Sequence, residues 1–188
     1  MANDHVMILG VGNLLFSDEG FGVRVVEELE RRYSFPENVS IVDGGVLGVS
    51  LLGVMSEADQ LIVVDVIRNK GVPGDLYRLE GDAIPERIRA KNSLHQIDFL
   101  EALTLCQAME KVPEAVILGV EPEDINTLST ELTETTKNRM EDVIRMVLGE
   151  LERLGVTYND KGADDHVSCL LYTSPSPRDG ETHRVCRL

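Results

Sequence analysis

The sequence predicts an α/β protein: a three-layer α/β/α sandwich around a mostly parallel, twisted sheet of about five strands. Short apolar runs alternate along the chain with segments whose apolar residues recur at helical spacing. Glycine-rich or acid-rich loops directly follow several of the apolar runs. With 188 residues, 43% of them hydrophobic, the chain suits one domain, which we place at residues 1–160.

In the first half, residues 5–9 form the first expected strand. A helix follows, because apolar residues recur every fourth position, and Pro36 stops it. Residues 39–42 form a second strand and residues 47–55 a short helix. The apolar face of the first helix comprises Phe21, Val25, Leu29 and Tyr33.

The second half continues the alternation. Residues 61–66 are apolar and β-branched, as in a central strand covered on both faces. Residues 75–80 are polar and mixed, which indicates an edge strand and allows an antiparallel orientation. A helix begins near Ser93 with a capping box, and residues 115–120 form another strand. Thr133 caps the last helix, and Gly155 ends it. The core face of that helix comprises Met140, Ile144, Val147, Leu151 and Leu154.

The end of the chain, residues 161–188, has a different character. It shows no periodicity and carries two Ser-Pro pairs, so we expect it to be disordered. The stretch SCLLYTSPSPRDG also resembles read-through of a sequencing or cloning adapter. This resemblance offers a non-native origin for residues 161–188, and we leave them out of the functional reasoning.

The net charge of the chain limits the kinds of molecule that it can bind. The 33 acidic residues outnumber the 18 basic ones, for a formal net charge of −15, which argues against nucleic-acid binding. No apolar run is long enough for a membrane helix, and the first ten residues lack the features of a secretory signal. We expect a cytoplasmic protein. The cysteines show no metal or disulfide spacing and look incidental: Cys106, Cys169 and Cys186.

The most informative stretch is VMILGVGNLLFSDEGFG at residues 6–22, which predicts a strand, a polar loop and a helix start. Gly10 and Gly12 invite comparison with the dinucleotide fingerprint, but Leu15 stands where the third glycine belongs. The loop instead carries two carboxylates, Asp18 and Glu19, at a helix N-terminus.

Acidic residues end three successive predicted strands or their loops: Glu19, Asp43 and Asp65. His95 begins a later helix at what should be the same edge. Since the carboxyl ends of parallel strands converge, two carboxylates and one imidazole could form a metal site with open positions. Nickel, zinc, iron and manganese are all chemically admissible, and the absence of thiolates disfavours a structural zinc site.

Each of these residues also has a simpler interpretation. Glu19 could complement the helix dipole, Asp18 could cap the helix, and His95 could be an ordinary first-turn residue. Asp43 before Gly-Gly is more often a turn former, and the run from Glu121 to Asp124 reads as a solvated loop. Asp65 is the exception, because a carboxylate in a buried strand needs a compensating partner.

Four segments together resemble the nickel-iron hydrogenase maturation endopeptidases. These are LGVGNLLFSDEGFGVRVVEEL near the start, DGG at residues 43–45, LIVVDVI around Asp65 and SLHQ around His95. They occur in order at compatible spacing over roughly residues 6–156. The first motif is specific, and four in series leave little room for chance.

The resemblance implies that the protein cleaves the C-terminal extension from the large-subunit precursor of a nickel-iron hydrogenase. The cut would follow a basic residue in the sequence and would take place once nickel has been inserted. The resemblance also implies a twisted sheet flanked by helices, and it matches Glu19, Asp65 and His95 with the metal ligands and catalytic residues. The nickel is supplied by the precursor. Asp43 matches the family's second acidic motif, whose role would be substrate fit or support of the metal ligands, and we group Asp43 with Gly44 and Asn13 as candidate substrate-binding residues.

Two rival functions are a non-catalytic nickel-binding assembly chaperone and a metal-dependent hydrolase of small molecules on a similar fold. The hydrolase would need a phosphate or ribose pocket, and the first loop lacks both the third glycine and a basic residue. Neither a Ser-His-Asp nor a Cys-His arrangement offers a competing nucleophile.

Overall fold

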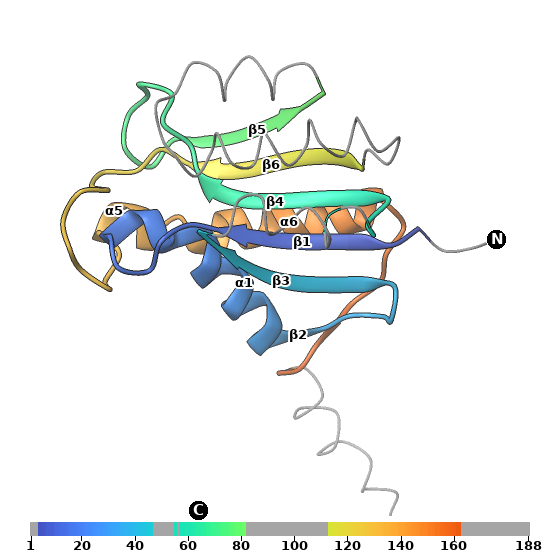
Figure 1. The fold of residues 1–188 in the computed structure, drawn as a ribbon. Helices are drawn as coiled ribbons and strands as arrows, with labels where there is room; N and C mark the ends of the chain where they lie inside the picture. Colours follow the sequence, from blue (N-terminus) through green and yellow to red (C-terminus); the bar gives the residue numbers. More distant parts are fainter. Residues whose placement is uncertain (1–3, 47–54, 56, 82–112, 163–188) are drawn as a thin grey trace, which may run out of the picture.

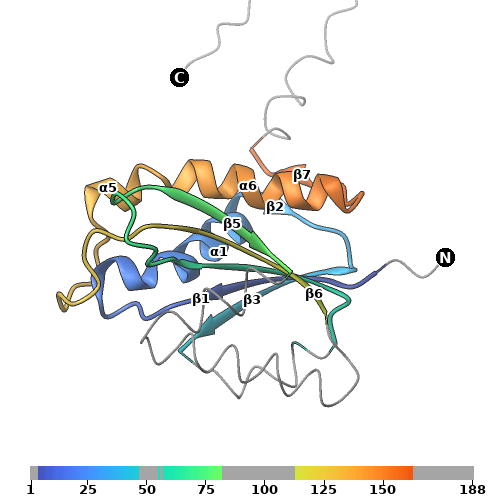
Figure 2. The ribbon, with the colours of Figure 1, turned by 90° about the horizontal axis from the view of Figure 1, so that it is seen from above.

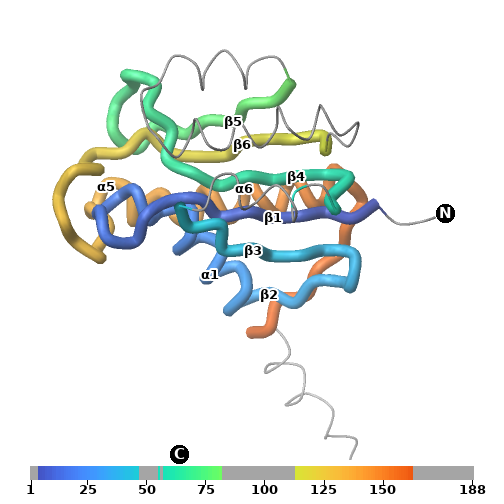
Figure 3. The backbone as a smooth tube through the Cα atoms, viewed as in Figure 1, coloured from blue at the N-terminus to red at the C-terminus, as the bar shows by residue number. Residues whose placement is uncertain are grey.

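The computed structural model describes residues 4–46, 55, 57–81 and 113–162. Five strands form the main sheet in the order β3-β1-β4-β6-β5 (Figures 1 and 3). Strands β3, β1, β4 and β6 run parallel to one another, and β5 runs antiparallel to β6 at the edge. The predicted sheet and the antiparallel edge strand are therefore confirmed. The strands are β1 (Val6–Val11), β3 (Val39–Gly45), β4 (Gln60–Val66), β5 (Leu76–Glu80) and β6 (Glu114–Val120).

Helices α1 (Phe21–Arg32) and α6 (Met140–Arg153) lie together on one face of this sheet (Figure 2). Their apolar residues pack against alternate residues of the strands in one core. The predicted last helix is divided in two. Thr133 caps the short helix α5 (Glu134–Lys137), accepting from the Thr136 N–H, and α6 then starts anew at Met140.

Side-chain alternation along β4 divides the core between the two faces of the sheet. Ile62, Val64 and Val66 belong to the core under α1 and α6, whereas Leu61 and Val63 pack with Met55 on the opposite face. Asp65 has the same parity as Leu61 and Val63, so its side chain belongs to that opposite face.

A two-stranded antiparallel sheet joins β2 (Tyr33–Ser34) to β7 (Asn159–Asp160). Its four-residue spacing from Leu29 predicted that Tyr33 belongs to the first helix, but Tyr33 is the first residue after α1. Its ring packs edge-on against Tyr158 with a centroid separation of 5.6 Å. Lys161 still donates its N–H to the Arg32 carbonyl at 2.8 Å, which ties the chain after α6 to the end of α1.

Several predicted features lie outside the described residues. They include the short helix up to residue 54, the helix from Ser93, His95, all three cysteines and residues 163–188. Every helix in the described part of the chain is too short or too polar to cross a bilayer.

Candidate functional site at the carboxyl edge of the sheet

Asp65 lies at the carboxyl end of β4 and is half-buried. Its Oδ1 accepts a hydrogen bond from the N–H of Val66 at 2.7 Å. The neighbouring residue on β6 is Gly119. A Cβ added at Gly119 would lie 2.2 Å from the Asp65 carbonyl oxygen, so this position has no room for a side chain. The β6 strand therefore presents no side chain beside Asp65 at this part of the edge.

Glu19 reaches the same edge from the loop between β1 and α1. It lies in η1 (Ser17–Gly20), a single 3₁₀ turn, and its carbonyl oxygen accepts from the Asn13 N–H at 3.1 Å. Gly12 has a φ of 142°, and a Cβ there would lie 1.8 Å from the same carbonyl oxygen. Only glycine lets the loop fold back this closely.

Gly22 presses the start of α1 against both central strands. A Cβ at this position would lie 2.2 Å from the Val64 carbonyl oxygen and 2.3 Å from that of Val11. Gly22 is three residues after Glu19, and Val64 immediately precedes Asp65. The two acids therefore come from adjacent strand ends at one edge, where α/β proteins bind ligands.

The third expected ligand, His95, lies outside the described residues, so the three-residue site remains a prediction. No three His, Cys, Asp or Glu side chains within the described ranges are arranged to hold a metal ion. The two carboxylates present nevertheless suit a hard or borderline divalent ion that brings further ligands of its own.

Asn13 and Asp43 shape their loops through short-range bonds. The Asn13 Oδ1 accepts from the Leu15 N–H at 3.0 Å, and the Asp43 Oδ1 accepts from the Gly45 N–H at 2.9 Å. Gly44, between Asp43 and Gly45 at the end of β3, is buried, while Asp43 is exposed. The turn-forming role of Asp43 is thus observed, and its role in substrate binding stays a prediction.

Asp18 does not cap a helix as its position suggests. It is fully buried, and its carboxylate accepts five hydrogen bonds from the segment that follows β6 and from α5. Oδ1 accepts from the Thr133 N–H and the Thr136 hydroxyl, at 2.8 and 2.6 Å. Oδ2 accepts from the N–H groups of Glu123 and Asp124 and from the Thr133 hydroxyl, at 2.9 to 3.0 Å.

These five donors hold the Glu19 loop from behind. Sequence reasoning missed them, because the donors lie more than 100 positions away and three of them are backbone groups. The Thr133 and Thr136 hydroxyls were the only side-chain signal, and their spacing reads equally well as a helix start.

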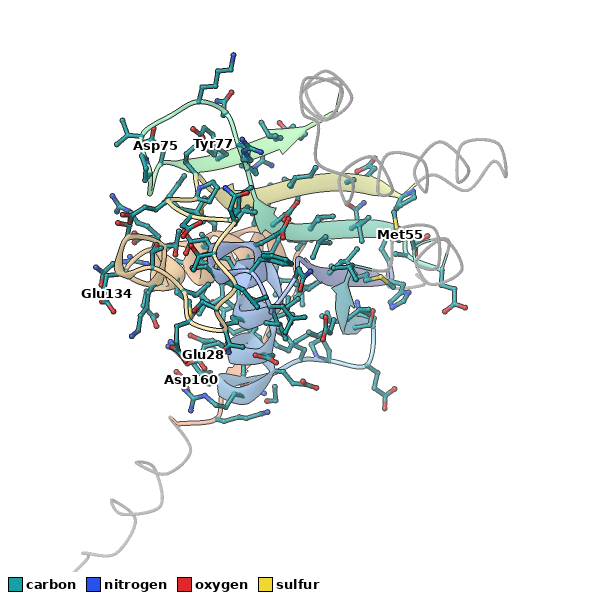
Figure 4. The ribbon with its side chains drawn as sticks, turned by 60° about the vertical axis from the view of Figure 1, so that its left-hand side comes forward. Glu28, Met55, Asp75, Tyr77, Glu134 and Asp160 are labelled. Carbon is teal, nitrogen blue, oxygen red and sulfur yellow. The ribbon has the colours of Figure 1, made fainter. Side chains whose placement is uncertain are left out.

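Glu121 is 6% exposed and is not the solvated loop residue that its acidic neighbours suggest. Its Oε2 accepts from the Asn69 N–H and the Tyr77 hydroxyl, both at 2.8 Å. Burial, together with the Glu121 carboxylate, raises the pKa of Tyr77 to about 12. The phenol therefore remains a donor at neutral pH and fixes the loop that follows Asp65. Figure 4 shows Tyr77 beside Asp75 at the start of β5.

These features are typical of an α/β enzyme: a mostly parallel sheet, loops packed closely by glycines and two acids at adjacent strand ends. In such enzymes the active site lies at the carboxyl edge of the sheet. The sequence of residues 23–150 matches the family described as hydrogenase maturation protease.

Relatives and solved structures agree with this match. The chain is 37% identical over 163 residues to the hydrogenase expression/formation protein HupD of Bradyrhizobium diazoefficiens, covering 86% of this chain and 85% of that protein. It is also 37% identical to the hydrogenase 2 maturation protease of Escherichia coli, covering 80% and 93%. The structure of the hydrogenase maturating endopeptidase HybD from Escherichia coli superposes with a TM-score of 0.81 at 35% identity, covering 85% and 99%.

The chain belongs to the hydrogenase maturation protease family, whose members are hydrolases. The structural likeness also confirms the predicted α/β sandwich.

Proposed function

We propose that this protein is the endopeptidase that removes the C-terminal extension of a nickel-iron hydrogenase large-subunit precursor after nickel has been inserted. The observation that carries the proposal is the arrangement of Glu19 and Asp65 at adjacent strand ends, in a chain of this family. We place the reaction in the cytoplasm.

In this proposal the nickel ion is part of the substrate. The precursor holds it, and Glu19, Asp65 and His95 complete its coordination from the protease side. The ion then serves as a checkpoint, because a precursor without nickel lacks the group that joins substrate to enzyme. Carboxylate and imidazole ligands suit such a borderline ion.

The ion also assists hydrolysis by polarising the scissile carbonyl or by lowering the pKa of a bound water. One of the two carboxylates takes the proton from the attacking water and delivers it to the departing amine. Two hydrogen bonds support such a role: the Val66 N–H binds the Asp65 carboxylate, and the Asn13 N–H binds the Glu19 carbonyl oxygen, which orders the backbone at both acids.

The test is the mass of the precursor after incubation with the protein. We expect loss of the C-terminal peptide from nickel-loaded precursor and none from nickel-free precursor. Asp65→Asn should abolish the loss, whereas Glu57→Gln, which alters an exposed acid just before β4 at the opposite edge, should leave it intact.

The rival functions predict different outcomes in the same assay. Stable association with nickel-loaded precursor without a change of mass would identify an assembly chaperone. Neither association nor cleavage would leave the small-molecule hydrolase. Cleavage at the wild-type rate by Asp65→Asn would contradict the role assigned to that residue.

A further inference from the structure

The exposed large hydrophobic side chains of the described residues gather at one edge of the molecule. All of them lie in loops or strand ends where β1, β3, β4 and β6 finish, or where the antiparallel β5 begins beside the end of β6. They are Leu15, Val46, Val72, Leu76 and Leu128. Within this edge, exposed apolar residues that lie next to each other mark an interaction surface more often than residues that stand singly.

Leu15 and Leu128 are adjacent, although 113 positions separate them. Phe16 and Ser129 form a parallel bridge, so the residues that precede them stand across from each other. The Ser129 N–H donates to the Leu15 carbonyl at 3.0 Å, and the Ser17 N–H donates to the Ser129 carbonyl at 2.7 Å. We call this pair, 57% and 74% exposed, the Leu15–Leu128 patch.

A polar scaffold holds the patch in place. Behind Leu15, the buried Asp18 carboxylate bonds to the segment between β6 and α5. The Ser17 hydroxyl donates to the Glu131 carbonyl at 3.0 Å, and the Arg24 guanidinium donates to the Thr130 carbonyl at 2.6 Å. The leucines therefore project from a backbone that is already ordered, which lowers the entropic cost of binding a partner.

The charge around the patch selects the occupant. Residues 12–20 and 121–134 contain seven acids and no Lys, Arg or His. Asp18 and Glu121 are buried, but Glu123, Glu131 and Glu134 are exposed. Arg24 lies beside the patch with its guanidinium bound to the Thr130 carbonyl, so acids still outnumber bases there. A second copy of this chain, at a formal charge of −15, would meet the patch with like charge. The surroundings suit an apolar segment flanked by basic side chains.

We propose that the Leu15–Leu128 patch is the docking site for the large-subunit precursor, which contacts it through an apolar segment with basic neighbours. The inference rests on the proposed function, and it adds a binding surface separate from the ion ligands. Leu15 is four residues before Glu19 in the same loop, so a polypeptide that covers the patch is led directly toward the candidate site.

The test compares Leu15→Ser, Leu128→Ser and the double variant with Val72→Ser. Val72 is 69% exposed at the β5 side of the same edge, which makes its replacement a matched control. The substrate is the nickel-loaded precursor from the organism that makes this protein, and peptide release is followed by mass. We expect the double variant to raise KM about tenfold or more, with kcat within about twofold. Thermal midpoints should not change, because the replaced side chains are exposed.

Salt provides a second readout. If basic side chains of the precursor flank the patch, KM of the wild type should rise with ionic strength. A KM for the double variant within twofold of wild type would overturn the docking site, as would an equal loss from Val72→Ser. A wild-type dimer that the double variant converts to a monomer, with unchanged cleavage, would identify a self-association surface instead.

Failure of the proposed function gives a different pattern. If the wild type binds precursor without cleaving it, the chemical step is wrong, and the same variants test docking through the dissociation constant. If the wild type neither binds nor cleaves, both proposals fall together.

Discussion

Replacing Asp18 with Asn tests how the Glu19 loop is held. The substitution keeps the size of the side chain but converts one carboxylate oxygen into an amide NH₂ that cannot accept a hydrogen bond. The best placement keeps the amide oxygen at Oδ2, where it still accepts from Glu123, Asp124 and the Thr133 hydroxyl. The NH₂ then faces the Thr133 N–H and the Thr136 hydroxyl.

The loss at these two donors sets the magnitude. The Thr136 hydroxyl can turn to the Thr133 carbonyl, which already lies 3.2 Å away, but the Thr133 N–H is left facing another donor. Losing a hydrogen bond to a charged group and burying a donor without a partner costs about 2–4 kcal/mol. We expect Asp18→Asn to lower the free energy of unfolding by about 3 kcal/mol, which corresponds to a fall in melting temperature of about 6–12 °C.

Urea denaturation followed by circular dichroism measures this change, with Glu123→Gln as the control. Glu123 is an exposed acid in the same segment, so its replacement should stay within about 0.5 kcal/mol of wild type. A stability of Asp18→Asn within that same margin would refute the argument that the five hydrogen bonds hold the two segments together.

Three further predictions concern packing and charge. Gly22→Ala should lower the free energy of unfolding by about 1–3 kcal/mol and slow cleavage, because the added Cβ would meet two strand carbonyls. Gly149→Ala in α6 is the control: its Cβ has open space, so it should leave stability unchanged or raise it. Equal melting temperatures for the two variants would contradict this prediction. The Arg31 and Arg32 side chains hold the pKa of Glu28 at about 2, below 4.5, so the stability it contributes is complete above pH 4.5 and is lost as pH falls toward 2. Glu28→Gln should therefore flatten the stability profile in that window, and an unchanged profile would contradict it. The Arg78 guanidinium on β5 is the main cause that lowers the pKa of Glu150 in α6, and Glu150 is 7% exposed. Arg78→Ala should therefore lower the free energy of unfolding by about 1–3 kcal/mol. The control is Arg145→Ala, at an exposed arginine of α6, and a smaller change from Arg78→Ala than from this control would contradict the prediction.

Local periodicity was sufficient to predict the main sheet. Residues 61–66 are apolar at every position but one, and β4 is indeed central with both faces buried. The polar, mixed composition of residues 75–80 likewise predicted an edge strand, and β5 lies at the edge and exposes every second residue. The β2–β7 pair could not be found this way, because two strands of two residues carry no periodic signal and form only when distant segments meet.

The candidate site was predictable in part, for the same reason. Glu19 and Asp65 follow recognisable strands, and the rule that parallel strands present their carboxyl ends at one edge brings them together. The predictions for Asp18 and Glu121 were wrong: Asp18 was interpreted as a helix cap because it precedes a helix, and Glu121 as a solvated residue because its loop is acidic and contains a proline. Their burial depends on donors from other loops, which only the folded chain supplies.

A double-mutant cycle on kcat/KM for peptide release from nickel-loaded precursor tests most directly whether Glu19 and Asp65 act on one ion. We predict that Glu19→Gln and Asp65→Asn each lower kcat/KM by about a thousandfold or more and that the double variant loses little beyond either single one, because groups that act as a unit are not additive. Losses that multiply, or near-normal cleavage by either single variant, would contradict a shared site.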